Sequence, residues 1–181
     1  MSKKSLQLSS LAAFTLIEIL VTVSITALIM LGITSLFISF VMSAGKSRMS
    51  QSVRESGTVA MQKIIEELRN AKSITLNETQ CNGTTQLTTL SFKKTNADNA
   101  EISGKFSSSG ISNKRILFTE GTNDYFLTGD NHHLSNLTFV CHGGAMPKYI
   151  EINFTLATGA TAVNDINQSK LDFKSGVTLR N

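Results

Sequence analysis

The chain has 181 residues, with 17 Lys or Arg against 13 Asp or Glu and a formal net charge of +4. That length fits one modest domain plus an anchor, and so small a charge excess excludes strong electrostatic steering toward nucleic acid. Residues 14–44 are almost wholly apolar or small, whereas residues 73–181 are rich in Ser, Thr, Asn and Gly. The sequence therefore divides into an apolar N-terminal segment and a polar C-terminal region.

The first predicted element is a membrane-spanning helix over residues 14–45. From Ile19 to Ala44 the sequence has no charged residue, and these 26 residues make about 39 Å of helix against a hydrocarbon core of roughly 30 Å. A secretory signal peptide is not favoured, because its apolar stretch is shorter and is followed by small residues at the cleavage site. Here the small pair Ala12-Ala13 precedes the apolar stretch. A plain single-pass anchor is the alternative.

Glu18 lies inside this apolar segment, where a carboxylate costs roughly 2.5–3.5 kcal/mol on insertion scales. No Lys, Arg or His occurs between Phe14 and Gly45, so a cationic partner must come from another helix or from a chain terminus. An unpaired or protonated Glu18 is the alternative. Cleavage after Ala13 would create an ammonium group at Phe14. The ammonium of a neighbouring copy could pair with Glu18 and fix the axial offset between the two helices.

The run Ala13-Phe14-Thr15-Leu16-Ile17-Glu18, followed by an uncharged helix, resembles the prepilin cleavage and methylation motif of type IV pilins and type II secretion pseudopilins. The resemblance covers roughly residues 3–45. It implies a leader peptide over residues 1–13, cleavage between Ala13 and Phe14 with N-methylation of Phe14 by a prepilin peptidase, and a role for Glu18 in subunit recruitment. The family usually has Gly before the cut and many major pilins have a Pro within the helix, whereas this chain has Ala13 and only Pro147.

The same resemblance implies partners and a location. The partners are other pilin subunits through helix packing, an inner-membrane assembly platform with its ATPase, and membrane lipid before assembly. The implied location is a single span in the inner membrane with the head outside the cytoplasm, then an extracellular or periplasmic filament. The order of features in the head is a helix ending at residues 67–71, then paired strands, then a chain end over residues 176–181. This order resembles that of minor pilins and pseudopilins, which favours a minor subunit.

The predicted function is thus a structural subunit of a type IV pilus-like filament in pilus biogenesis, secretion or DNA uptake. We expect no enzyme activity and no cofactor, because the sequence has no nucleophile elbow, phosphate-binding loop or paired-carboxylate motif. The alternative from another class is a single-pass, membrane-tethered extracellular binding module that does not polymerise.

Lys46 and Arg48 mark the predicted membrane boundary, and an amphipathic continuation of the helix is expected over residues 46–72. Lys63 and Glu67, and Glu66 and Arg69, are opposite charges at helical-neighbour spacing, worth a few tenths of a kcal/mol per pair. Apolar or small residues at spacings of three or four predict a core-facing side, formed by Met49, Val53, Gly57, Ala60, Ile64, Leu68 and Ala71.

Residues 73–181 are predicted to form a β-rich head. Runs rich in β-branched, aromatic or alternating residues predict strands at 87–92, 115–119, 125–127, 134–141, 149–156 and 177–179. Turn-like composition predicts turns at 82–83, 107–110, 121–124, 129–131, 143–144 and 159–160, and a loop over 160–175. The predicted fold class is α+β, with a long N-terminal helix packed on an antiparallel sheet as in type IV pilins.

Cys81 and Cys141 both lie in the predicted head. An even number of cysteines in an exported domain predicts one disulfide, and two buried free thiols are the alternative.

Metal and nucleic-acid sites are less well supported by the sequence. No metal site is predicted, because the histidines lack ligand-type spacing with Cys141 and the aspartates supply too few oxygens for calcium. These residues are His132, His133, His142, Asp98, Asp124 and Asp130. Nucleic acid is a further candidate partner. It would bind the basic residues Lys93, Lys94, Lys105, Lys114 and Arg115. The alternative is that these residues lie in solvated β-loops and bind no nucleic acid.

Overall fold

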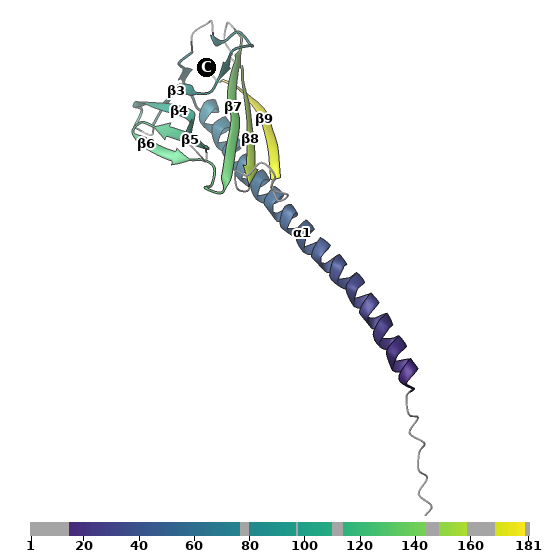
Figure 1. Ribbon diagram of the computed structural model, residues 1–181. Helices are drawn as coiled ribbons and strands as arrows, with labels where there is room; N and C mark the ends of the chain where they lie inside the picture. Colours follow the sequence, from purple (N-terminus) through teal and green to yellow (C-terminus); the bar gives the residue numbers. More distant parts are fainter. Residues whose placement is uncertain are drawn as a thin grey trace, which may run out of the picture. The chain divides into compact units, whose positions relative to one another are not determined.

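The computed structural model describes residues 15–76, 80–96, 98–109, 114–143, 149–158 and 169–179. The chain forms two compact units that divide between Ala44 and Gly45. One helix, α1 (Leu16–Arg69), contributes residues to both units, and the strands of the described residues all belong to the second unit (Figure 1).

In the first unit, α1 runs without interruption through the apolar segment. Its large hydrophobic side chains from Leu16 to Met42 are 45–83% exposed. The hydroxyl groups of Ser24 and Thr34 each donate to the backbone carbonyl four residues earlier, so these polar groups are satisfied within the helix. By length and composition, α1 is the one helix among the described residues that could cross a membrane.

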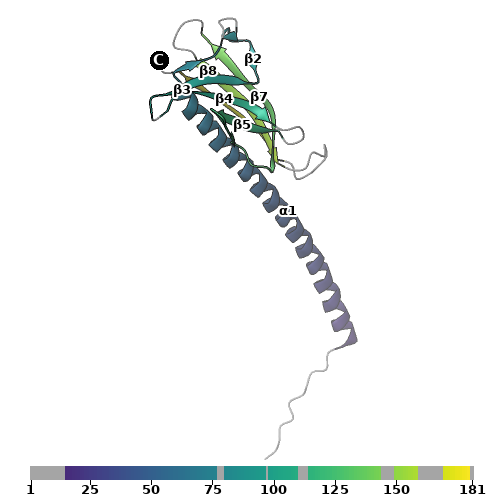
Figure 2. The same ribbon diagram turned by 90° about the vertical axis from the view of Figure 1, so that its left-hand side faces the viewer.

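In the second unit, the strands form two antiparallel sheets at the C-terminal part of α1 (Figures 1 and 2). The first sheet has the order β1-β3-β4-β5-β6 and contains β1 (Ser73–Ile74), β3 (Leu90–Thr95), β4 (Glu101–Ser109), β5 (Arg115–Glu120) and β6 (Asn123–Phe126). The second sheet has the order β2-β7-β8-β9 and contains β2 (Gln86–Leu87), β7 (His132–His142), β8 (Tyr149–Thr158) and β9 (Ser169–Thr178).

The core of the second unit lies between the C-terminal part of α1 and the two sheets. The helix contributes fully buried side chains at Val53, Ala60, Ile64 and Leu68. The sheets contribute a phenylalanine cluster centred on Phe106, whose ring centroid lies 5.0 Å from that of Phe118 and 6.3 Å from that of Phe139. Because Phe106 and Phe118 belong to the first sheet and Phe139 to the second, this cluster joins the two sheets.

The predicted α+β class and the antiparallel pairing are confirmed, and the head contains two sheets where one was expected. Met49 was expected in the core, but it is 37% exposed because the buried stripe of α1 begins only at Val53. The helix ends at Arg69, close to the expected end at Lys72.

Several regions of the head differ from the predicted strands and loops. The predicted strand over 87–92 is divided between β2 and β3, which belong to different sheets and are separated by residues 88–89. β4 was not predicted, and Ser107–Ser109 belong to this strand and not to a turn. Likewise, residues 169–175 lie in β9, so the expected loop over 160–175 is wrong for that part. In β4, buried Gly104 and Phe106 alternate with exposed polar residues. In β9, half-buried Leu171 and Phe173 alternate with exposed Lys and Asp, so polar residues dominate the composition of both strands. The predicted turn at 159–160 lies outside the described residues.

Gly57 allows close packing between α1 and β9. An added Cβ at Gly57 would lie 2.0 Å from Cζ of Phe173, whereas at Gly45, in the same helix, it would meet no atom within 4 Å. Glycine inside a helix is less favourable than alanine by about 1 kcal/mol, so the contact with Phe173 gives a reason for its presence.

Gly57→Ala is therefore expected to lower the free energy of unfolding by about 1–3 kcal/mol, because overpacking against Phe173 outweighs the gain in helix propensity. Gly45→Ala, the matched control, should leave stability unchanged or raise it by up to about 1 kcal/mol. Thermal unfolding of the detergent-solubilised chain measures both effects. Equal melting temperatures for the two variants would show that Phe173 does not restrict position 57.

Candidate functional site

Glu18 lies in the first turn of α1, and Thr15 caps that turn. The backbone N–H of Glu18 donates to the hydroxyl oxygen of Thr15 at 3.3 Å and to its carbonyl oxygen at 3.1 Å. Thr followed by Glu three residues later is the capping-box pattern, and a carboxylate at a helix N-terminus is favoured by the helix dipole. The Thr-x-x-Glu spacing itself is the sequence signal for this role, which adds to the charge-pairing role expected for Glu18.

The cap binds the backbone N–H of Glu18 and does not neutralise its carboxylate. Glu18 is exposed, and the ion pairs of the described residues all involve Lys63 or residues after it. Ala13 and Phe14, the predicted processing residues, lie outside the described residues. Within the described chain, Glu18 is therefore a carboxylate without an ionic partner, next to a large apolar surface.

That apolar surface surrounds α1 in the first unit. The exposed side chains include Leu20, Ile29, Leu36 and Phe40, each at least 56% accessible. A helix that is apolar on all sides is stable only when lipid or other protein covers it. The segment can therefore cross a membrane or pack among other helices.

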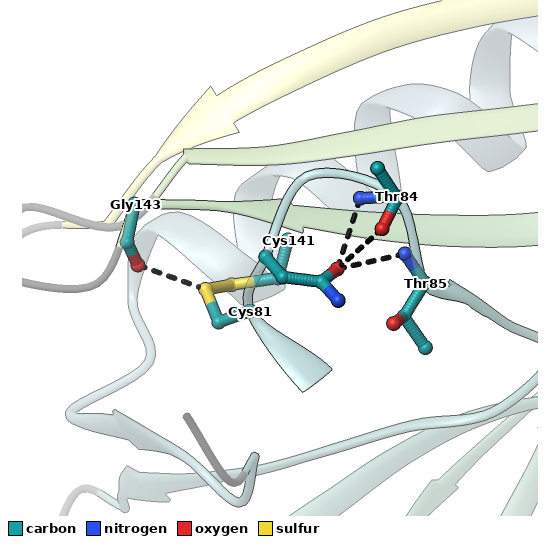
Figure 3. Close-up of a disulfide and its surroundings, with 6 residues drawn as sticks. Cys81, Thr84, Thr85, Cys141 and Gly143 are labelled. Carbon is teal, nitrogen blue, oxygen red and sulfur yellow. Dashed lines mark hydrogen bonds between the residues drawn. A yellow bond between two sulfur atoms is a disulfide. The ribbon is translucent and has the colours of Figure 1, made fainter. Parts of the chain in front are cut away.

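Cys81 and Cys141 form a disulfide in the head, as predicted (Figure 3). The two Cα atoms are 4.5 Å apart, within the range that a disulfide requires. The bridge attaches the segment before β2 to β7, and the N–H of Gly83 donates to the carbonyl of Cys141 at 2.9 Å. The carboxamide oxygen of Asn82 accepts hydrogen bonds from the backbone N–H groups of Thr84 and Thr85, both at 2.9 Å. This turn and the disulfide together fix the 81–85 segment on the second sheet.

A chain of four charged groups connects α1 to the first sheet. Glu67 accepts from Lys63 Nζ at 2.8 Å and from Lys94 Nζ at 2.6 Å, and Lys94 Nζ also lies 2.6 Å from Glu120 Oε1. The side chains of Glu67 and Lys94 are only 8% and 14% exposed. The Lys63–Glu67 spacing was visible in the sequence, but no local pattern could indicate that Lys94 would reach Glu67 from β3.

Most of the basic residues considered for nucleic-acid binding are engaged in ion pairs. Lys94 lies in the chain of charges just described, Lys93 Nζ lies 3.9 Å from Glu101, and Arg115 pairs with Asp130. The guanidinium of Arg115 also stacks on the ring of Phe126. These pairings reduce the positive charge that the first sheet presents to solvent.

The residues considered for metal binding are dispersed. His132 is buried with its Nε2 3.4 Å from the hydroxyl of Ser52, and Cys141 is committed to the disulfide. The ring of His142 lies 5.7 Å from that of Tyr149 and is tilted by 49° to it. Among the described residues, no three His, Cys, Asp or Glu side chains are grouped closely enough to hold a metal ion.

The aspartates considered for calcium are engaged in local contacts. Asp124 accepts from the hydroxyl of Thr119 at 2.7 Å, and Asp130 pairs with Arg115. The backbone N–H of Asp98 donates to the side chain of Asn96. These contacts support turns and hairpins in the first sheet and do not bring the three carboxylates together.

The described residues thus define a chain with one exposed apolar helix segment and a disulfide-bonded α+β head. No protein-family model, curated protein or solved structure matches the chain.

The charges around Glu67 make the stability of the head depend on pH. Burial raises the pKa of Glu67, but hydrogen bonds and charges from Lys63 and Lys94 outweigh burial, so its pKa lies below the ordinary value of 4.5. A depressed pKa stabilises the folded head above pH 4.5, and this contribution is lost as the pH falls through the folded-state pKa.

Glu67→Gln is expected to destabilise the head by about 1–3 kcal/mol at neutral pH, because Lys94 loses one of its two carboxylate partners in a mostly buried position. The variant should also lose stability less steeply than the wild type below pH 4.5. Melting temperatures between pH 3 and 7 measure both effects. Glu66→Gln is the control, since Glu66 is 63% exposed and 3.5 Å from Lys63. An equal loss in the two variants would contradict the role given to Glu67.

Proposed function

We propose that this chain is a structural subunit of a type IV pilus-like filament, assembled through α1. The observation that carries the proposal is Glu18, the one charged residue in the otherwise uncharged and exposed part of α1 from Leu16 to Ala44. The motif from Ala13 to Glu18 supports it.

The physical argument starts from what the exposed helix needs. In a bilayer, lipid covers the apolar side chains, but the Glu18 carboxylate remains costly. In a bundle of identical helices, neighbouring copies cover the apolar surface and can also supply a cation. The ammonium of Phe14, generated by cleavage after Ala13, is a cation four residues before Glu18 in the sequence, and it exists only in the processed chain.

The proposal includes the route to the filament. A prepilin peptidase cleaves between Ala13 and Phe14 and methylates Phe14, and an inner-membrane platform with its ATPase then extracts the subunit from the membrane. The head lies outside the cytoplasm, in the periplasm or in an extracellular filament. The Cys81–Cys141 disulfide supports this side of the membrane, because disulfides persist in oxidising compartments. A minor pilin or pseudopilin in pilus biogenesis, secretion or DNA uptake fits this description.

Glu18→Gln separates the two roles of Glu18. Glutamine serves at this position of a capping box as glutamate does, so the variant keeps the helix start but removes the charge. We expect normal membrane insertion and loss of the subunit from sheared filaments, measured by immunoblotting of membrane and filament fractions.

Thr15→Ala is the matched control for this experiment, because it removes the cap and keeps the carboxylate. Loss of an N-cap lowers the stability of a helix by about 0.5–2 kcal/mol, so the Thr15→Ala protein should still enter filaments. Normal incorporation of Glu18→Gln would refute the charge-pairing mechanism, and loss of incorporation only in Thr15→Ala would assign position 18 a capping role alone.

The N-terminus distinguishes the filament subunit from a membrane-tethered binding module. Mass spectrometry of the native chain should find methylated Phe14 as the first residue. Ala13→Asp should block cleavage, because the family motif has a small residue there, and should retain the leader. A wild-type chain that keeps residues 1–13 would contradict processing and favour the tether.

A further inference from the structure

A groove of about 450 Å³ lies between α1 and the β5–β6 hairpin. We name it the head groove and define it by Val59, Lys63 and Glu67 of α1 and by Glu120, Tyr125 and Phe126 of the hairpin. All of these residues belong to the second unit. The size is within the range of pockets that hold small molecules or the anchoring side chains of a partner.

The rim of the head groove is apolar and exposed. Val59, Tyr125 and Phe126 are 57%, 47% and 48% exposed. They are the three most accessible of the five exposed large hydrophobic side chains of the described second unit; the others are Met49 and Tyr149. β6 is also the last strand of its sheet, and all four of its residues are exposed. Gathered apolar side chains beside a free strand edge are typical of a surface that binds another protein.

The groove also has a negative charge excess. Glu66, Glu67, Glu120, Asp124 and Asp130 lie in or beside it, against Lys63, Lys94 and Arg115, whose guanidinium covers the ring of Phe126 and pairs with Asp130. Lys94 is largely buried and already shared between two carboxylates. The exposed charge at the rim is therefore mainly acidic, and it complements a partner segment that is basic and carries an apolar side chain.

Such a segment occurs on the same chain. Lys46, Arg48 and Arg54 are exposed on α1 around the partly exposed Met49, and we name residues 46–54 the basic belt. In the described part of the chain, none of these three cations has an ion pair. Glu55 is the nearest acidic residue in the sequence.

We propose that the head groove of one copy binds the basic belt of a second copy, with Met49 entering between Val59 and Tyr125. The two surfaces differ, so the contact is heterologous and leaves one groove and one belt free at each end. Repetition of such a contact builds an open assembly. The proposal rests on the filament function proposed above and specifies which surfaces of the head are joined.

The spacing along α1 defines the offset between the two copies. Met49 and Val59 are ten residues apart, about 15 Å of helix rise. A Phe14–Glu18 pair spans four residues, about 6 Å. With parallel helices, the two contacts therefore join a subunit to different neighbours. The belt can face lipid phosphates while the helix is in a membrane, and it needs other anions once the subunit leaves the bilayer.

The test uses filaments of the full-length chain carrying Met49→Cys together with Val59→Cys. A bismaleimide shorter than the spacing of the two positions cannot join them within one helix. Added reagent will spare the native cysteines, which form the disulfide and are 3% and 1% exposed. We expect a ladder of covalent multimers on denaturing gels, and only dimers when the two single variants are co-expressed. Mass spectrometry should identify position 49 of one copy linked to position 59 of another.

Met49→Cys with Gln62→Cys is the matched control, because Gln62 is exposed on α1 but does not line the groove. Filaments that form normally but give no ladder, or the same ladder from the control, would overturn this interface and leave the filament function standing. A link from position 59 to a different polypeptide would overturn the assignment of a second copy as the occupant. Absence of the wild-type chain from any filament would overturn both proposals.

Discussion

The structure depends on one constraint, which is that the apolar side chains of α1 from Leu16 to Met42 have no cover within the described chain. A surface of this kind is unfavourable in water, so the segment requires either a bilayer or a bundle of helices. The hydroxyl groups along the segment donate back to the helix backbone, so they suit either environment. Glu18 suits a bundle better, because another chain can approach it with a cation, whereas lipid tails cannot.

In the second unit, three kinds of contact hold the head together around a single helix and two sheets. Gly57 lets Phe173 approach the helix backbone, and the charge chain from Lys63 to Glu120 joins α1 to β3 and β5. The disulfide then attaches the segment before β2 to β7. These contacts make the C-terminal part of α1 an integral part of the head.

The sequence predicted the elements whose periodicity is clear. The stripe from Val53 to Leu68 has the helical spacing, and β8 alternates cleanly from Ile150 to Leu156, so both were found. β4 and β9 were missed or shortened because their outward positions are Ser, Lys and Asp, which mask the inward Phe106, Leu171 and Phe173. The disulfide followed from the cysteine count. The head groove could not be predicted, because Val59 and Tyr125 are 66 positions apart in the sequence and only the packing of the hairpin on α1 brings them together.

Glu18 and Thr15 show how one short motif can have two physical roles. A threonine cap with a glutamate at the third helical position is a sufficient reason for a helix to begin where α1 does, and a soluble helix could use the same pair. What distinguishes this helix is the absence of any other charge up to Ala44. A cap can be built with serine and glutamine at much lower cost in an apolar environment. The presence of a full charge where a neutral cap would suffice is the physical reason for the proposal that the charge has a partner on another chain.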